Sequence, residues 1–126
     1  MKATVEAVKA QYPKRKLVAA LELHTFSSLN KEFFQHYKGA MSAADRAFVY
    51  YSEHTLKMKK LPHVTKAEVK AAFDHPNITV FTENDKLVSA LRRFSWKKKN
   101  LLLMSSGTFN GVDLKGLAKE LLKKSS

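Results

Sequence analysis

Four short and nearly continuous apolar runs constrain the fold of this chain more than any other feature of its sequence. They span Leu17 to Leu23, Ala47 to Tyr51, Ile78 to Phe81 and Asn100 to Met104. Strands that are buried on both faces have this composition, and such strands belong to parallel sheets. The runs therefore predict four parallel strands in a single sheet.

Amphipathic patterns predict helices before, between and after these runs. The helices are expected at residues 2–11, 30–40, 65–73, 83–94 and 113–124. Thr65 and Glu68 match a capping box, and Asp113 is a candidate cap for the last helix. The last helix is expected to turn an apolar stripe inward, made of Leu114, Leu117, Ala118, Leu121 and Leu122. Strand and helix thus alternate four times.

This alternation is typical of an α/β fold. With right-handed crossovers it predicts a three-layer α/β/α sandwich on a Rossmann-like parallel sheet of about four strands. The 126 residues suffice for a single domain, 1–126. We expect the strand order 3-2-1-4, with Asn100 to Met104 as an unusually apolar edge strand. Such an edge should pair with another molecule, lie under the leading helix or promote association.

The leading helix, Lys2 to Gln11, leaves two interpretations open. Its apolar side carries Ala3, Val5, Ala7 and Val8, and no strand precedes it. In a strand-helix-strand architecture, a helix before the first strand normally follows an earlier strand. The chain therefore either starts inside a domain or has a true N-terminal helix.

Composition narrows the classes of function. Cysteine is absent, which excludes disulfides, thiolate metal sites and a cysteine nucleophile. No stretch approaches the roughly 20 apolar residues of a membrane span, and the first residues lack the apolar core of a secretory signal. We therefore expect a cytoplasmic location and no membrane partner.

The formal net charge of +12 raises the question of polyanion binding. The positive residues are mostly Lys, in short clusters at 14–16, 57–60, 97–99 and 123–124. Aromatic residues are not interleaved with Arg, as a base-stacking surface would require. The distribution argues against nucleic acid as the partner.

Several catalytic signatures are missing from the sequence. It contains no G-x-x-x-x-G-K-[ST] loop for triphosphates, no G-x-G-x-x-G after the first strand, no H-E-x-x-H and no G-x-S-x-G. A parallel α/β protein carries its chemistry in the loops after its strands. These loops are therefore where a site is expected.

Polar residues do collect in these loops. Hydroxyls, a histidine and glycines beside helix N-termini suit an anionic ligand, although each loop taken alone is better explained as ordinary caps and turns. A third loop, residues 52–55, is weaker. The first and fourth loops together predict the binding site, made of His24, Thr25, Phe26, Ser27, Ser28 and Asn30 with Ser105, Ser106, Gly107, Thr108, Phe109, Asn110 and Gly111.

Other conspicuous residues are interpreted as structural. His36, His63 and His75 are expected at the surface or in turns, and Trp96 at the sheet edge or a helix end. Tyr50 and Tyr51 should point to opposite faces of the sheet and act in packing.

At this point the sequence resembles a known family. The run Tyr12-Pro13-x-Arg15-x-Leu17 leads to Leu23-His24-Thr25-Phe26-Ser27, and Leu103-Met104-Ser105-Ser106-Gly107-x-Phe109-x-Gly111 follows the fourth apolar run. These segments resemble the C-terminal domain of Mur ligases, which form amide bonds in peptidoglycan synthesis, and most of all its muropeptide ligase branch, Mpl. Leu23 and Ser28 stand where the family often has Pro and Arg.

The resemblance implies a substrate-binding domain of a larger ATP-dependent ligase. In such an enzyme, ATP with Mg²⁺ converts the carboxylate of UDP-N-acetylmuramate to an acyl phosphate, which the amine of an amino acid or peptide attacks. The UDP-binding and ATP-binding domains would lie outside this chain. The isolated chain should therefore be inactive, contribute no catalytic residue and bind neither metal nor ATP.

Two alternatives remain open. One is the C-terminal domain of a folylpolyglutamate synthetase, which would share the fold. The other is a non-enzymatic basic α/β module that binds nucleic acid or protein.

Overall fold

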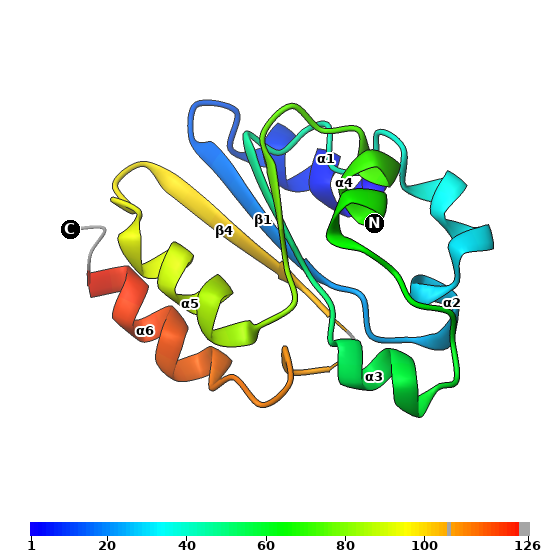
Figure 1. The fold of residues 1–126 in the computed structure, drawn as a ribbon. Coiled ribbons are helices and arrows are strands. Elements are labelled where there is room, and N and C mark those ends of the chain that lie inside the picture. The colour runs from blue at the N-terminus through cyan, green and yellow to red at the C-terminus, as the bar shows by residue number, and fades with distance from the viewer. Residues whose placement is uncertain (106, 124–126) are drawn as a thin grey trace.

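The computed structural model describes residues 1–105 and 107–123, and it is a three-layer α/β/α sandwich (Figure 1). The central strands are β1 (Lys16–Glu22), β2 (Arg46–Tyr50), β3 (Ile78–Phe81) and β4 (Lys99–Met104). All of their pairings are parallel, and the order is β3-β2-β1-β4. The expected fold class and strand order are both confirmed.

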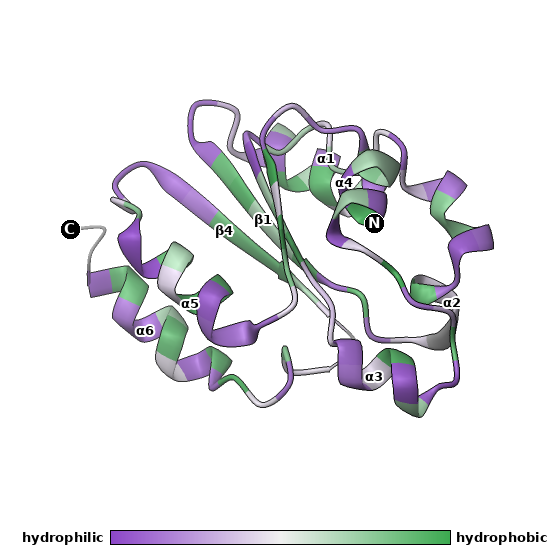
Figure 2. Cartoon of the chain, in the orientation of Figure 1, coloured by the Kyte–Doolittle hydropathy of each residue, from purple (hydrophilic) through white to green (hydrophobic). Residues whose placement is uncertain are grey.

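Helices cover both faces of this sheet. One face packs against α1 (Lys2–Gln11), the 3-10 helix η1 (Lys31–Tyr37), α3 (Glu53–Met58) and α4 (Lys66–Phe73). The other face packs against α5 (Asn84–Arg93) and α6 (Leu114–Lys123). Apolar residues run along the central strands, while the surrounding helices alternate apolar and polar residues (Figure 2).

The two faces have separate apolar clusters, which explains the continuous apolar character of β1. Leu17, Ala19 and Leu21 join one cluster, whereas Val18 and Ala20 join the other. Tyr50 and Tyr51 divide in the same way, as expected from the alternation of side chains along a strand. The Tyr51 hydroxyl donates to the Val64 carbonyl at 2.6 Å, and burial raises the pKa of Tyr51 to about 12.

The helix predicted at residues 30–40 is wrong in detail. A short helix, α2 (Phe26–Leu29), precedes it, and the 3-10 helix η1 replaces the α-helix. Asn30 has an extended backbone between the two and caps η1, because its side chain accepts from Glu32 N–H at 3.0 Å. Asn30 therefore precedes η1 as its cap, and the helix starts one residue later than predicted.

Two predicted caps are confirmed. Thr65 and Glu68 form both hydrogen bonds of the capping box at the start of α4. The Asp113 carboxylate accepts from Gly116 N–H at 3.1 Å, as an N-cap does. The predicted helix end at Lys124 lies outside the described residues.

His75 corrects the expectation that it would lie at the surface. It lies between α4 and β3 and is buried, with Nε2 2.8 Å from the Ala44 carbonyl oxygen, and its Nδ1 accepts from Asn77 N–H at 2.9 Å. Trp96 behaves as predicted and covers the end of α5, where its indole N–H donates to the Leu91 carbonyl at 2.8 Å. Among the described residues, no helix combines the length and apolar character that a bilayer crossing requires.

The apolar stripes of the two helices beside β4 are only partly buried. On α6, Leu117 and Leu121 reach the core, but Ala118 and Leu122 remain exposed. On α1, Val5 is buried and Val8 is only partly buried. Both helices extend beyond the edge of the sheet, so Ala118 and Leu122 have no strand beneath them among the described residues.

Candidate functional site

The loops after β1 and β4 meet because their strands are neighbours in the sheet. Leu21 of β1 pairs with Met104 of β4 at the carboxyl end of the ladder, so the residues that follow the two strands leave the sheet side by side. The chain crosses from β1 to β2 in one direction and later returns to β4 on the other side of β1. Such a switch point opens a crevice at the carboxyl ends of the strands.

Glu22 joins the two loops at this point. It is the last residue of β1, and its side chain is 3% exposed. Its Oε1 accepts hydrogen bonds from the Ser105 hydroxyl and from Phe109 N–H, the latter at 2.9 Å. A buried carboxylate is costly unless it is hydrogen-bonded, and here both donors come from the β4 loop.

His24 and Gly107 lie on the solvent side of Glu22. The imidazole Nδ1 of His24 is 3.7 Å from Glu22 Oε2, and the His24 side chain is 46% exposed. A Cβ placed on Gly107 would lie 3.2 Å from Glu22 Oε1 and 3.5 Å from His24 Cδ2. The absence of a side chain at position 107 therefore lets the two loops approach closely.

Phe109 anchors the second loop in the core. It is buried, its ring stacks on Tyr50 with centroids 6.3 Å apart, and its backbone has a positive φ of 54°. The Asn84 side-chain amide donates to the carbonyls of Phe109 and Asn110, both at 3.1 Å. Burial raises the pKa of Tyr50, and the nearby Glu22 charge acts in the same direction.

The remaining hydroxyls of the first loop are used locally. Thr25 caps α2, since its Oγ1 accepts from Ser28 N–H at 3.1 Å, and the Ser28 hydroxyl donates back to the Thr25 carbonyl at 2.9 Å. Tyr37 fixes this segment by donating to the Ser28 carbonyl at 2.7 Å, and burial raises the pKa of Tyr37 to about 12. Ser27 and Asn30 instead line a small hollow of about 220 Å³.

The second loop ends in a tight turn before α6. Gly111 N–H donates to the Thr108 hydroxyl at 3.0 Å, and both Asn110 and Gly111 have positive φ angles. Gly111 therefore serves a structural role, because its positive φ angle favours glycine, whereas the φ angle of Gly107 is not positive. Ser106 lies outside the described residues.

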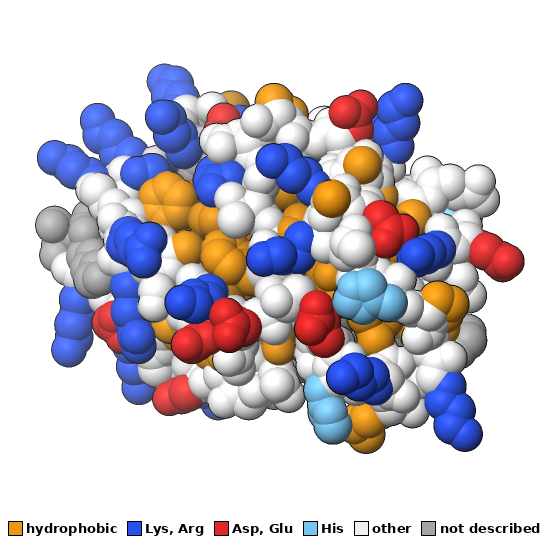
Figure 3. All heavy atoms as spheres, in the orientation of Figure 1, with side chains coloured by type: hydrophobic (Ala, Val, Ile, Leu, Met, Phe, Trp, Pro, Cys, Tyr) orange, Lys and Arg blue, Asp and Glu red, His pale blue; other side chains and the backbone are white. Residues whose placement is uncertain are grey.

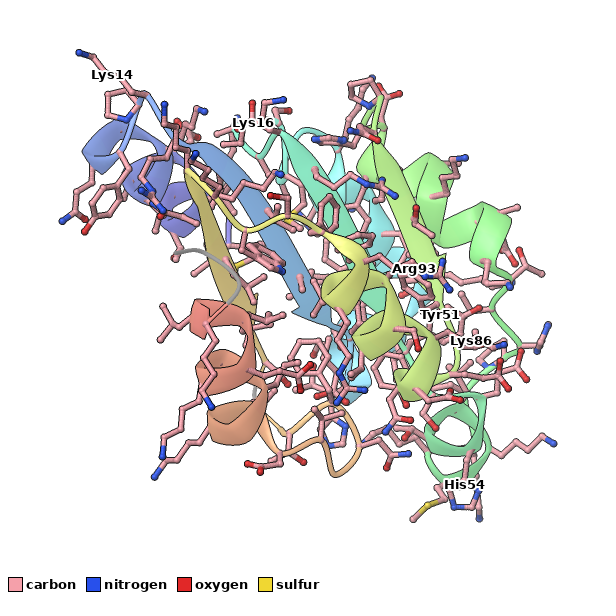
Figure 4. All side chains as sticks on the ribbon, turned by 90° about the vertical axis from the view of Figure 1, so that its left-hand side faces the viewer. Lys14, Lys16, Tyr51, His54, Lys86 and Arg93 are labelled. Atoms are coloured by element: carbon pink, nitrogen blue, oxygen red, sulfur yellow. The ribbon has the colours of Figure 1, made fainter. Side chains whose placement is uncertain are left out.

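The third polar segment, residues 52–55, does not have the structure that the sequence predicted, and it is not part of the candidate site. It was expected as a loop but forms the cap and first turn of α3, where Ser52 Oγ accepts from Thr55 N–H at 3.3 Å. His54 therefore projects from α3 at the end of the molecule opposite Lys14 and Lys16 (Figure 4).

Sequence reasoning missed Glu22, Asn84 and Tyr50 as parts of this region. The signal for Glu22 was present, because it is a lone acidic residue at the end of an apolar run. The candidate site offers the exposed imidazole of His24, hydroxyl groups and loop backbone above the buried Glu22 carboxylate. These groups suit a polar ligand. The described residues contain no group of three or more His, Cys, Asp or Glu side chains able to hold a metal ion.

Comparison with known proteins places this fold. No family model matches the sequence. No curated protein matches it either. Among solved structures, the fold is that of a domain from Haemophilus ducreyi 35000HP, attributed to a UDP-N-acetylmuramate:L-alanyl-γ-D-glutamyl-meso-diaminopimelate ligase. The TM-score is 0.58 at 21% sequence identity, covering 97% of this chain and 78% of that one. Identity at this level establishes the fold.

Proposed function

We propose that this chain is the substrate-binding domain of a Mur-type ligase and that its two joined loops hold the incoming amino acid or peptide. The observation that carries the proposal is the junction at Glu22, which holds the His24 and Ser105–Gly111 loops together. These are the two segments in which the sequence resembles the ligase family. The fold shared with the Haemophilus ducreyi domain supports the same assignment.

The proposed role of the chain is positioning rather than bond making. Holding an amine in line with an activated carboxylate converts an encounter between two molecules into a local reaction, which can contribute several kcal/mol (roughly 7 to 11 in the best cases). ATP, Mg²⁺ and UDP-N-acetylmuramate would be bound by other domains of such an enzyme. The described residues offer neither a phosphate-cradling motif nor a metal cluster for them.

Nuclear magnetic resonance with isotope-labelled chain tests the proposal directly. The first ligand is the tripeptide L-alanyl-γ-D-glutamyl-meso-diaminopimelate. A second ligand, oligo-γ-glutamate, tests the alternative that the chain is a folylpolyglutamate synthetase domain. Backbone shifts should concentrate in His24–Asn30 and Ser105–Gly111. Affinity should be weak, because the other domains that would enclose the ligand are not in this chain.

A matched pair of variants sharpens the experiment. His24→Ala should weaken tripeptide binding, whereas His63→Ala, an exposed histidine elsewhere, should not. Shifts confined to the lysine clusters, with steep salt dependence toward duplex DNA, would instead support a polyanion-binding module.

A further inference from the structure

The turns that lead into β1 and β4 carry lysines that the candidate site does not use. In the first turn, Arg15 N–H donates to the Tyr12 carbonyl at 3.1 Å. In the second turn, Lys99 N–H donates to the Trp96 carbonyl at 3.3 Å. The two segments expose two lysines each, and these four form what we call the lysine cluster: Lys14, Lys16, Lys97 and Lys98.

Hydrogen bonds between the two turns hold the lysine cluster together. Lys16 N–H donates to the Lys98 carbonyl at 3.1 Å. The Arg15 guanidinium donates to the Lys99 carbonyl at 2.9 Å and to the Asn100 side-chain oxygen at 2.7 Å. Because neighbouring strands lie about 4.8 Å apart, the four lysines start from a strip about one strand spacing wide.

Among the described residues, no acidic side chain forms an ion pair with the lysine cluster. The segments 11–18 and 92–103 contain neither Asp nor Glu. Asp45, one residue before β2, already pairs with Lys9 at 2.8 Å. Lys16 acts on Asp45 only through its charge, which contributes to lowering the Asp45 pKa. The positive charge of the cluster is therefore largely uncompensated within the chain.

Lys98 adds a backbone constraint to this uncompensated charge. Its φ angle is +58°, in the left-handed region that favours glycine, at the third position of its turn. A side chain is unfavourable in that region, and repulsion between the charges of Lys97 and Lys98 is unfavourable as well. Strained backbone and unpaired like charges at one place indicate a ligand site rather than a contribution to folding.

The side chains of the cluster suit recognition by charge alone. A lysine ammonium is a compact point charge, while the planar guanidinium of Arg15 is already used to join the turns. No aromatic ring belongs to the cluster, and Tyr12 lines a hollow beside β4 instead. Base stacking and insertion into a bilayer both require exposed aromatic or apolar groups. The cluster therefore matches phosphate groups that carry neither bases nor acyl chains.

The shape and position of the cluster suit a narrow ligand. Lys14 projects away from the fold in Figure 4, and blue side chains crowd the corner over the loops before β1 and β4 in Figure 3. A strip one strand spacing wide matches a single line of phosphates better than the broad face of a duplex or a bilayer. The cluster lies at the amino ends of the strands, opposite Glu22, so a ligand here leaves the candidate site open.

We propose that the lysine cluster binds linear inorganic polyphosphate, a chain of phosphates joined by anhydride bonds. The ammonium groups contact phosphate oxygens, and the release of counterions from the chain drives binding. The hydrogen bonds between the two turns place the lysines before the ligand arrives, which lowers the entropic cost of binding. This inference does not depend on the proposed ligase function.

Isothermal titration calorimetry with the whole chain tests this proposal. Long-chain polyphosphate, tripolyphosphate and orthophosphate are compared at equal phosphate concentration in low salt. We expect micromolar binding of the long chain and at least hundredfold weaker binding of orthophosphate, because only a chain reaches all four lysines at once. Binding of the long chain should weaken steeply as salt is added. Its amide shifts should map to residues 12–16 and 96–99.

A matched pair of double variants locates the contact. Lys97→Gln with Lys98→Gln removes two charges from the cluster, and Lys57→Gln with Lys60→Gln removes two exposed charges at α3 and just after it. Lys60 has a φ angle of +55°, so the control also matches the backbone conformation of Lys98. The first pair should weaken polyphosphate binding at least tenfold, whereas the control pair should change it less than twofold.

Glycine at the strained position separates binding from stability. Lys98→Gly relieves the left-handed backbone, so this variant should unfold at a higher urea concentration and yet bind polyphosphate at least threefold more weakly. Lys60→Gly is the control, which should gain stability in the same way and bind as tightly as the unaltered chain.

Four results would overturn the proposal. They are no binding of long-chain polyphosphate at millimolar phosphate, equal losses in the two double variants, unchanged binding by Lys98→Gly, and tighter binding of duplex DNA or phosphatidylglycerol vesicles than of polyphosphate at equal phosphate concentration. The last result would assign the cluster to a nucleic acid or to a membrane surface.

Discussion

The Glu22 carboxylate and the Phe109 backbone N–H lie 2.9 Å apart, although 87 positions separate them in the sequence. This hydrogen bond ties the end of β1 to the loop after β4. It also orients the loop that carries Gly107 next to His24. The geometry of the candidate site therefore depends on a buried residue that contributes little surface of its own.

Replacing Glu22 should destabilise the chain and loosen this loop. Glu22→Ala leaves Phe109 N–H and the Ser105 hydroxyl without their acceptor, which should lower the free energy of unfolding by about 1–3 kcal/mol. Urea unfolding measures the loss, and hydrogen exchange at the Phe109 amide should accelerate. Glu6→Gln, an exposed carboxylate on α1, should change stability by less than about 0.5 kcal/mol. Equal effects of the two variants would contradict this role of Glu22.

Two glycines of the same loop should respond differently to alanine. Gly111→Ala forces a side chain onto a backbone with φ of +92°, at a cost of roughly 1–2 kcal/mol, with no atom near enough to clash. Gly107→Ala keeps an ordinary backbone but brings its Cβ against Glu22 and His24. Gly111→Ala should therefore lower the free energy of unfolding more than Gly107→Ala does, as measured by urea unfolding.

Amide spectra distinguish the same two substitutions. Gly107→Ala should shift the resonances of His24 and Phe109 and weaken tripeptide binding, while Gly111→Ala leaves His24 unchanged. Unperturbed His24 resonances in Gly107→Ala would show that the two loops are not in contact.

Asp45 should make stability depend on acidic pH. Burial alone would raise the pKa of Asp45, but the hydrogen bonds from Lys9 and from Leu17 N–H outweigh it and lower the pKa below 3.8. Because the folded pKa is lowered, the stabilisation is complete above the ordinary pKa and disappears as pH falls through the folded value.

Melting temperatures from pH 3 to pH 6 measure this contribution. The difference in Tm between the unaltered chain and Asp45→Asn should be largest at pH 6 and shrink toward pH 3. Glu6→Gln serves as the exposed control and should follow the unaltered chain throughout. A gap that is constant with pH would show that the charge of Asp45 plays no part.

The isolated chain should neither hydrolyse ATP nor form amide bonds. Its sequence contains no phosphate-cradling loop, and the proposed role needs only a bound peptide. A phosphate-release assay with ATP, Mg²⁺ and the tripeptide should give the same rate as buffer. Turnover that disappears on mutation of His24 or Glu22 would contradict this prediction.

The sequence by itself determined the layers of this protein and the positions of its strands. Apolar runs place β1 and β3 within one residue of their observed bounds, and the Thr65–Glu68 pattern fixes the start of α4. These features are local, since burial on both faces and capping each act within a few residues. Placing the two polar loops at one switch point followed from strand order alone.

Tertiary structure decided how these loops are held together and what the sheet edge exposes. Glu22 stands out in the sequence as a lone acidic residue, but its partners Ser105 and Phe109 are known only from the structure, because a long-range hydrogen bond leaves no periodic pattern in the sequence. Ala118 and Leu122 carry an inward-facing pattern but lie beyond β4, because the pattern of a helix does not state how wide a sheet it covers. The aromatic spacing likewise predicted an α-helix over residues 30–40, whereas the structure has the 3-10 helix η1, which begins after the extended Asn30.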